Sequence, residues 1–412
     1  MRSFTVRARH VLPIAGPPLL GGWLRVQRGR IVAVGRRAPP AGCRDVGDCI
    51  LLPGLVNAHA HLEFSGLDRP LDAAGGLPAW IARVVAWRRA REASPGAAAA
   101  VRAAIAAGLA ESAAAGVTAI GDIATSVAAH VAVGPGPRLR VFREGLGLVP
   151  ATVETATRTV ARDLDTLARA GIDAGISPHA PYTVAAPLGR RLLATARDRD
   201  LPVAMHLAES DAEPELLARG TGPFRDLLAS LGAWDAARPP SLLPAEEWIS
   251  LLARRSRGVV VHATHIGCAP DALARLARHR DRLCVAVCPR TTHAISGVLP
   301  PLALLRAAGV RVCLGTDGRG SSPDLSILAE CRTLVDAGLA SPAEALTMAT
   351  RDGAWALGFD HRCGTLNPGR NADFLVLRPT QAHADPHDAA LDPATRIVAV
   401  VRSGRLIHGV LP

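Results

Sequence analysis

Eight short apolar runs between residues 50 and 340 constrain the fold more than any other feature of the sequence. They are mostly continuous in Val, Ile and Ala, which is typical of parallel strands covered on both faces. Longer Ala- and Leu-rich segments with helical patterns separate them. The predicted strands are residues 50–59, 116–123, 139–145, 174–179, 202–207, 258–262, 283–288 and 310–316, and the predicted helices include 96–115, 152–170, 188–200, 271–280 and 324–337. Eight such units predict an α/β fold, a (β/α)₈ TIM-like barrel.

The two ends of the chain differ from this central pattern. Short β-like pieces separated by Gly and Pro occur in residues 1–49 and again in 358–412. We therefore expect the barrel to span residues 50–357 and the two ends to form one small β-sandwich domain. The alternative, a doubly wound open sheet, would call for a G-x-G-x-x-G turn after an early strand, and the sequence has none there.

Composition excludes several functions. The formal charge is +11, yet all 47 Lys and Arg residues are Arg and they are scattered along the chain. A nucleic-acid-binding protein concentrates its charge on one face and supplies stacking aromatics, but aromatic residues make up only 3% here. We expect no nucleic-acid partner. Without lysine the chain cannot form a Schiff base, a phosphate-binding loop lysine or a carbamylated lysine that bridges two metals.

Cysteine usage and the N-terminal segment bear on location. None of the eight cysteines forms a C-x-x-C motif and several lie in apolar runs, which favours a reducing compartment. Residues 11–24 resemble a signal peptide, but three prolines interrupt them. No uncharged apolar run approaches the roughly 20 residues that span a bilayer. We expect a cytoplasmic protein with no membrane partner. A homodimer is plausible for a basic barrel with exposed apolar surface.

Polar residues follow five of the eight predicted strands, at the end where barrel enzymes carry their chemistry. One histidine after an apolar run is more often a core or loop residue than a ligand, but five such strand ends in one barrel argue for a shared site. They are His59 and His61 after the first strand, His179 after the fourth, His206 and Glu209 after the fifth, His262 after the sixth and Asp317 after the eighth.

The pair His59 and His61 has the spacing of a metal chelate. In an extended backbone, residues two apart point to the same side, so both imidazoles face the barrel mouth. With His206 and Asp317 they could hold one divalent ion, Zn²⁺ or Fe²⁺. Such a site leaves a position for water, whose pKa the ion lowers. Glu209 could then face that water and shuttle a proton.

The stretch Leu-Pro-Gly-Leu-Val-Asn-Ala-His-Ala-His-Leu at 52–62 resembles the opening motif of the metal-dependent amidohydrolase superfamily. Residues 177–183, 206–209 and 314–317 are similar to the deaminase and chlorohydrolase branch of this superfamily. Residues 348–354 and 369–374 are similar to the segment in which the chain of these proteins passes from the barrel back into the small β domain. The resemblance implies one metal per chain and a role for each site residue. The metal ligands would be His59, His61, His206 and Asp317; Asp317 would also accept the water proton, Glu209 would shuttle it, His262 would contact the water or the tetrahedral intermediate, and His179 would contact the substrate.

The resemblance also implies a reaction, the hydrolytic deamination of an amino-substituted purine nucleoside. Residues 61–65 and 77–81, followed by an arginine-rich helix, are similar to deaminases of 6-aminodeoxyfutalosine in menaquinone biosynthesis. This small-molecule substrate carries a benzoate, for which we expect a cationic clamp. Arg143, Arg290 and Arg319 are candidates, each equally well explained by a structural ion pair, and Trp80 could stack on a ring or close the core.

Other functions stay open at this stage. Deamination of adenosine, methylthioadenosine or guanine, and removal of chloride, would use the same ligands. Glu63, in the run His-Leu-Glu after the opening pair, could reach the substrate, but an ion pair with a loop arginine is the simpler role. From a different functional class, a barrel that has lost catalysis could act as an interaction protein, although every expected catalytic position is filled.

Overall fold

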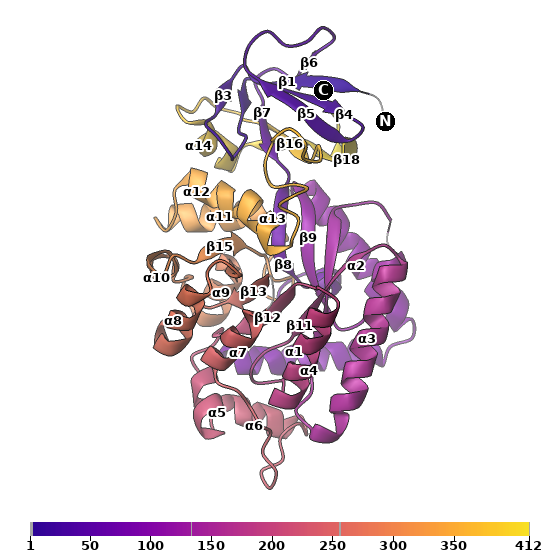
Figure 1. The fold of residues 1–412 in the computed structure, drawn as a ribbon, viewed down its shortest axis with the longest axis vertical. Helices are drawn as coiled ribbons and strands as arrows, with labels where there is room; N and C mark the ends of the chain where they lie inside the picture. The colour runs from indigo at the N-terminus through magenta and orange to yellow at the C-terminus, as the bar shows by residue number, and fades with distance from the viewer. Residues whose placement is uncertain (1–2, 133, 255–256, 412) are drawn as a thin grey trace.

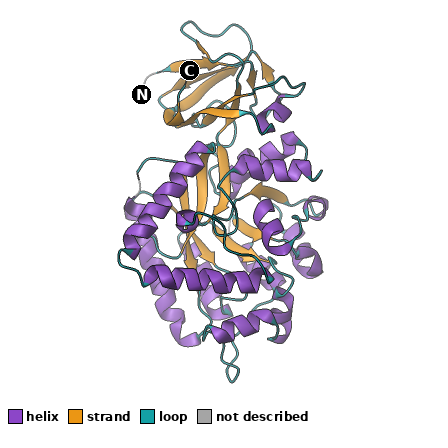
Figure 2. Ribbon diagram, turned by 180° about the vertical axis from the view of Figure 1, so that it is seen from behind, coloured by secondary structure: helices purple, strands orange, loops and turns teal. Residues whose placement is uncertain are grey.

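The barrel consists of eight parallel strands in chain order, surrounded by helices (Figures 1 and 2). The computed structural model describes residues 3–132, 134–254 and 257–411. The barrel strands are β8 (Leu55–Ala60), β9 (Val117–Ala124), β10 (Arg138–Gly145), β11 (Asp173–Pro178), β12 (Val203–Leu207), β13 (Gly258–His262), β14 (Leu283–Val287) and β15 (Arg311–Leu314). A bridge between Ala60 and Asp317 brings the first and last strands together. The expected TIM-like barrel is thereby confirmed.

The first predicted strand, residues 50–59, is wrong as a single element. It divides into β7 (Ile50–Pro53) and β8, and β7 pairs with strands of the terminal sheet. The change of sheet occurs at Gly54, where a Cβ atom would lie 2.1 Å from Thr118 Oγ1. Only glycine therefore fits where the chain passes from the small domain into the barrel.

Most of the helices cover the outside of the barrel, and several have one apolar face that packs against it. In α3, for example, the buried residues Val153, Val160, Leu164 and Leu167 recur at helical spacing. The five predicted helices correspond to α2 (Ala97–Ala114), α3 (Val153–Arg169), α4 (Ala186–Asp198), α8 (Pro270–Arg278) and α11 (Ile327–Asp336). Further helices are α1 (Gly76–Glu92), α5 (Glu213–Arg219), α6 (Pro223–Ser230), α7 (Ala245–Leu252), α9 (Pro289–Ser296), α10 (Leu302–Ala307), α12 (Pro342–Thr347) and α13 (Gly353–Ala356).

Both ends of the chain build the small β domain at one end of the barrel (Figure 1). One sheet has the order β5-β4-β1-β6 and the other β18-β17-β16-β7-β2-β3. A shared core of N-terminal residues such as Val6 and Ile31 and C-terminal residues such as Phe374 and Val401 joins them. The elements are β1 (Phe4–Arg7), β2 (His10–Val11), β3 (Leu19–Leu20), β4 (Trp23–Gln27), β5 (Arg30–Gly35), β6 (Arg44–Asp45), β7, β16 (Phe374–Arg378), α14 (Pro386–Leu391), β17 (Arg396–Arg402) and β18 (Arg405–Gly409).

Helix α2 meets the length and hydropathy of a membrane span, alone among the helices described. One face of it is buried, with Ile105, Gly108 and Leu109 against the barrel. At Gly108 a Cβ atom would lie 2.3 Å from Ser65 Oγ, so the helix lies close to the short η1 helix (Leu62–Gly66) that follows the opening histidine pair. This is the packing of a helix in the outer ring of the barrel.

Candidate active site

Three histidines and one aspartate converge at the carboxyl ends of β8, β12 and β15. Asp317 Oδ1 lies 3.4 Å from His59 Nε2 and 3.4 Å from His61 Nε2. His61 Nε2 lies 3.3 Å from His206 Nε2. All four residues are buried, and one potential ligand atom from each falls within 4.8 Å of the others. The structure therefore brings together the four residues that the sequence predicts as metal ligands.

The chemical state of these side chains fits a divalent ion. Neither ring nitrogen of His59 has a hydrogen-bond partner among the described residues, although the side chain is fully buried. Burial lowers the pKa of His59 to about 3, so its imidazole is neutral, the form that ligates metals. His206 Nδ1–H donates to the His179 carbonyl at 3.0 Å, which leaves Nε2 facing the cluster. Three neutral imidazoles and a carboxylate suit Zn²⁺ or Fe²⁺.

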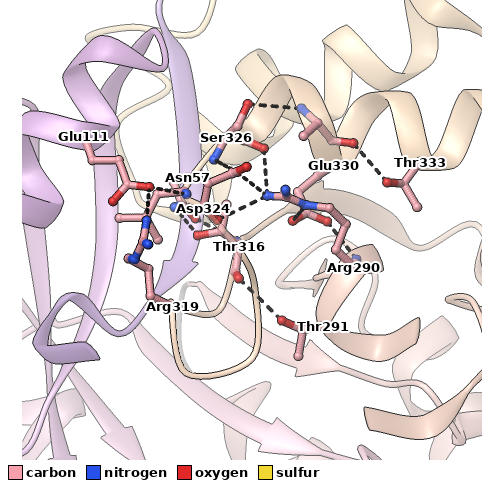
Figure 3. Close-up of polar contacts among 12 residues, drawn as sticks. Asn57, Glu111, Arg290, Thr291, Thr316, Arg319, Asp324, Ser326, Glu330 and Thr333 are labelled. Atoms are coloured by element: carbon pink, nitrogen blue, oxygen red, sulfur yellow. Dashed lines mark hydrogen bonds and ion pairs between the residues drawn. The ribbon is translucent and has the colours of Figure 1, made fainter. Parts of the chain in front are cut away.

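Hydrogen bonds fix the strand ends that carry these ligands. Asn57 Nδ2–H donates to Thr316 Oγ1 at 2.7 Å, and Thr316 N–H donates back to Asn57 Oδ1 at 3.2 Å (Figure 3). Ser321 Oγ–H donates to Asp317 Oδ2. Asp317 itself has a positive φ of 61°, a conformation unfavourable for a non-glycine residue that is typical of functional sites. These hydrogen bonds thus fix the ends of β8 and β15, and with them His59 and Asp317, before any ion binds.

Glu209 and His262 lie beside the ligand cluster. His262 Nε2 is 3.4 Å from Glu209 Oε1, and both ring nitrogens of His262 are buried without hydrogen-bond partners among the described residues. Burial, with further contributions from Asp317 and Glu213, raises the pKa of Glu209 well above its usual range. A carboxyl group in this state can hold a proton and release it to a basic atom of a substrate.

A cavity of about 330 Å³ opens above these residues. Its floor is polar and is formed by His61, His179, His206, Glu209, His262 and Asp317. Its walls are mostly apolar and come from α1, α6 and the loops after β10 and β11; Trp80 belongs to them, and its indole N–H donates to the Gly320 carbonyl at 3.2 Å. His179 Nδ1 contacts Thr183 Oγ1 at 2.5 Å, and His179 Nε2 lies 3.8 Å from Glu144 Oε1. The reactive side chains thus lie at the base of a pocket.

Residues 50–407 match the model of the Amidohydrolase family. The chain belongs to the amidohydrolase family. This membership confirms the expected enzyme class, a hydrolase acting on carbon–nitrogen bonds other than peptide bonds. Members use a divalent metal, and the buried ligand cluster is where this amidohydrolase would hold one.

Relatives and solved structures agree with this assignment. The chain is 31% identical over 386 residues to a 5-methylthioadenosine/S-adenosylhomocysteine deaminase of Halobacterium salinarum, covering 87% of this chain and 80% of the relative. A protein of the same name from Moorella thermoacetica is 28% identical over 408 residues, covering 94% and 88%. Among solved structures, Helicobacter pylori aminofutalosine deaminase in complex with methylthio-coformycin has a TM-score of 0.84 at 22% identity, covering 98% of this chain and 100% of that one. A Xanthomonas campestris adenosine deaminase with bound zinc has a TM-score of 0.74 at 25% identity, covering 98% and 92%.

The structure does not bring the three candidate arginines of this amidohydrolase to the cavity. Arg143 lies on β10, and alternation along the strand turns it outward, where its Nε–H donates to Asp163 of α3 at 2.6 Å. The neighbouring Glu144 faces inward instead. Arg290 is bound by Asp324 and Glu330, and Arg319 by Glu111 (Figure 3). All three are therefore engaged in structural ion pairs.

This placement of Arg143 predicts the effect of Arg143→Met. The variant should keep kcat and KM close to those of the wild type, because the side chain does not line the cavity. Its thermal midpoint should fall, because the partly buried Asp163 loses its charged partner at a cost of about 1–3 kcal/mol. Steady-state kinetics measure kcat and KM, and a thermal melt measures the midpoint. A large rise in KM for an anionic substrate with an unchanged melt would restore Arg143 to the site.

The sequence interpretation gave no role to three residues at or beside the site: Arg88, Glu144 and Glu213. Arg88 lies in the cavity wall, where its Nη2–H donates to Glu63 Oε1 at 2.5 Å. Glu63 therefore has the ion-pair role, although its partners lie on helix α1. A signal for Arg88 was present in the sequence: Leu77, Trp80, Val84 and Arg88 are three or four residues apart and fall on one helix face. For Glu144 and Glu213 no local pattern gave a signal.

Glu213 holds the turn that presents Glu209. Its carboxylate accepts the backbone N–H of Ala208 at 2.9 Å and that of Glu209 at 3.2 Å. Ala208 has a positive φ of 52°, so the turn is strained and depends on these bonds. Glu213 thus fixes the turn that carries Glu209.

We expect Glu213→Leu to lower kcat by about tenfold or more, since two buried N–H groups lose their acceptor and the turn relaxes. KM and metal content should change little. Glu213→Gln keeps one acceptor oxygen and should recover part of the rate. The measurements are steady-state kinetics, metal analysis and a thermal melt. Full activity in a folded Leu variant would show that the turn does not need Glu213.

Proposed function

We propose that this chain is a metal-dependent deaminase of an adenine nucleoside, and that its substrate is 6-aminodeoxyfutalosine. The observation that carries the reaction class is the convergence of His59, His61, His206 and Asp317 beside Glu209 and His262 at the base of one pocket. The motifs at residues 61–65 and 77–81 support the specific substrate. The apolar walls support it too, because they suit a nucleoside whose 5′ substituent is largely hydrocarbon.

Each residue of the site has a separate role in the replacement of the amino group by oxygen. His59, His61, His206 and Asp317 would hold a divalent ion, which would supply a nucleophilic water of lowered pKa. Asp317 accepts the proton of that water. Glu209 delivers a proton to the ring nitrogen next to the reacting carbon, and His262 hydrogen-bonds the added oxygen. Asp317 then passes its proton to the amino group, the carbon–nitrogen bond breaks and ammonia leaves. The added hydroxyl gives its proton to Glu209 and becomes the carbonyl oxygen of the ring.

Surrounding side chains make the pocket suitable for this chemistry. Burial keeps the imidazoles of His61, His206 and His262 neutral by lowering their pKa values well below the usual range. A neutral His262 can donate or accept a hydrogen bond at the reacting carbon. His179, held by Thr183, is placed to contact the heterocycle or an attached sugar. The apolar walls limit access of bulk water and so strengthen the electrostatic interactions at the base.

Deamination of methylthioadenosine or S-adenosylhomocysteine is the second candidate. Relatives at 28% and 31% identity carry that name, which favours it specifically. Methylthioadenosine also has an apolar 5′ substituent, so the pocket walls alone do not separate the two substrates. The difference between them is the carboxylate of aminodeoxyfutalosine.

A panel assay tests the proposal. Ammonia release by the metal-replete enzyme is measured with 6-aminodeoxyfutalosine, methylthioadenosine, S-adenosylhomocysteine, adenosine and guanine. We expect the highest kcat/KM for 6-aminodeoxyfutalosine, by at least about one order of magnitude, since a matched charged contact contributes that much. A higher kcat/KM for any other compound overturns the substrate assignment. Absence of ammonia release from all five compounds, with one metal bound per chain, would contradict the reaction class.

A further inference from the structure

One cationic side chain, Arg88, lines the active-site cavity of the described residues. It lies near the end of α1, the helix that follows the opening histidine pair. Leu77, Trp80, Ile81 and Val84 precede it on the same helix face and also line the cavity. Arg88 thus ends an apolar stripe. Arg88 also lies close to the polar floor, because its partner Glu63 follows His61 by two residues, so one ligand could contact the floor, the apolar face and the guanidinium group.

The donors of Arg88 are only partly used. Its Nη2–H is engaged by Glu63, but Nε is buried without a hydrogen-bond partner among the described residues. Its Cζ lies 5.2 Å from the centre of the Phe64 ring, so the guanidinium is held against an aromatic face as well. A planar guanidinium group held at the cavity wall by an ion pair and a ring suits an acceptor group such as a carboxylate.

The local charge favours an anion. Glu63 is shared between two arginines, because Arg91 Nη2 also contacts it at 2.6 Å. One carboxylate and two guanidinium groups leave one positive charge in this cluster. Two more carboxyl groups lie near Arg88. Glu92 lines the same separate cavity as Arg91, and burial raises the pKa of Glu144 to about 7, which weakens its opposition to an incoming anion. Within the cavity wall this excess charge is presented by Arg88, since Arg91 lines a separate cavity beside β9.

We propose that Arg88 binds the carboxylate on the apolar tail of the substrate and so selects an anionic nucleoside over neutral ones. The inference rests on the proposed function, because the carboxylate belongs to the proposed substrate. It assigns the expected cationic clamp to α1 and not to any of the arginines that follow the barrel strands.

The test compares an acid with its neutral ester. Arg88→Met removes the charge but keeps an unbranched side chain, and kcat/KM is measured with 6-aminodeoxyfutalosine and with its benzoate methyl ester. We expect the wild type to prefer the acid and the variant to lose about 10- to 100-fold on the acid, mainly in KM. The loss on the ester should be much smaller, so the preference disappears.

Arg91→Met is the matched control. Arg91 lies one turn further along α1, contacts the same Glu63 and has its Cζ 4.6 Å from the centre of the Trp87 ring, but it does not line the active-site cavity. The control should keep the preference for the acid. Equal losses on acid and ester in Arg88→Met, or the same loss of preference in Arg91→Met, would overturn the inference.

A second pair of compounds separates this inference from the proposed function. These are 5′-deoxy-5′-(benzylthio)adenosine and its carboxybenzyl analogue, tested as substrates or as competitive inhibitors. If the wild type ignores 6-aminodeoxyfutalosine, the proposed substrate is wrong, yet an Arg88-dependent preference for the carboxybenzyl compound would still support the clamp. Lack of any such preference in the wild type would contradict the clamp directly.

Discussion

Glu209→Gln is expected to lower kcat by about 10³-fold while the protein keeps one metal per chain. The amide matches the carboxyl group in size, so the cavity and the ligand cluster should persist. It cannot take up and release a proton, so the ring nitrogen is no longer protonated as water adds. Steady-state and single-turnover ammonia release measure the loss of rate, and metal analysis measures the metal bound per chain.

Glu247→Gln is the control for this substitution. Glu247 lies on α7 in an exposed ion pair, 3.7 Å from Arg190, outside the cavity. Its amide variant should match the wild type in rate and in metal content. The shuttle role would be contradicted by a Glu209→Gln variant that retains most of its activity. If Glu209→Gln lost its metal, Glu209 would instead be a metal ligand.

Removal of the metal is the second large effect. Chelation, or the substitution His59→Ala, should reduce activity by about 10³-fold or more, because the nucleophile then has the acidity of ordinary water. Zn²⁺ or Fe²⁺ should restore the chelated wild type but not the variant. Metal binding should also raise the thermal midpoint, since the ion binds the folded ligand cluster and not the unfolded chain.

His361→Ala serves as the control for His59→Ala, because His361 is exposed and lies outside the ligand cluster. It should retain the metal and the rate. Analysis of metal per chain in each protein decides the outcome. If His59→Ala held one metal with full activity, the assignment of this histidine as a ligand would fail. If the metal-free wild type were fully active, the reaction class itself would need revision.

Much of the barrel and of its polar floor was predictable because both depend on local patterns. A continuous apolar run marks a strand covered on both faces, and the barrel rule then places the residue after each run at a common end. That rule brings His59, His206 and Asp317 together across more than 250 residues of sequence. Neither the identity nor the order of the helices was needed for this step.

The features that the sequence did not predict depend on contacts that no local pattern encodes. Arg143 follows the same barrel rule as Glu144, and only the pleat of β10 decides which of the two faces the interior. Glu213 acts through backbone N–H groups, which carry no sequence signal. The division of residues 50–59 into two strands depends on the close approach of Thr118 to Gly54 in the folded chain. Such features arise from the assembled structure.

Both chain ends lie in the small β domain, while the active-site cavity is walled by α1 and α6 toward the opposite end of the barrel (Figure 1). Attachment at either end therefore leaves the mouth of the pocket unobstructed. The enzyme could be tethered to a solid support, or fused to a second protein, without blocking the entry of a nucleoside. By the same geometry, a fluorophore coupled at a terminus would report on substrate binding poorly, whereas one on α6 would lie beside the entrance.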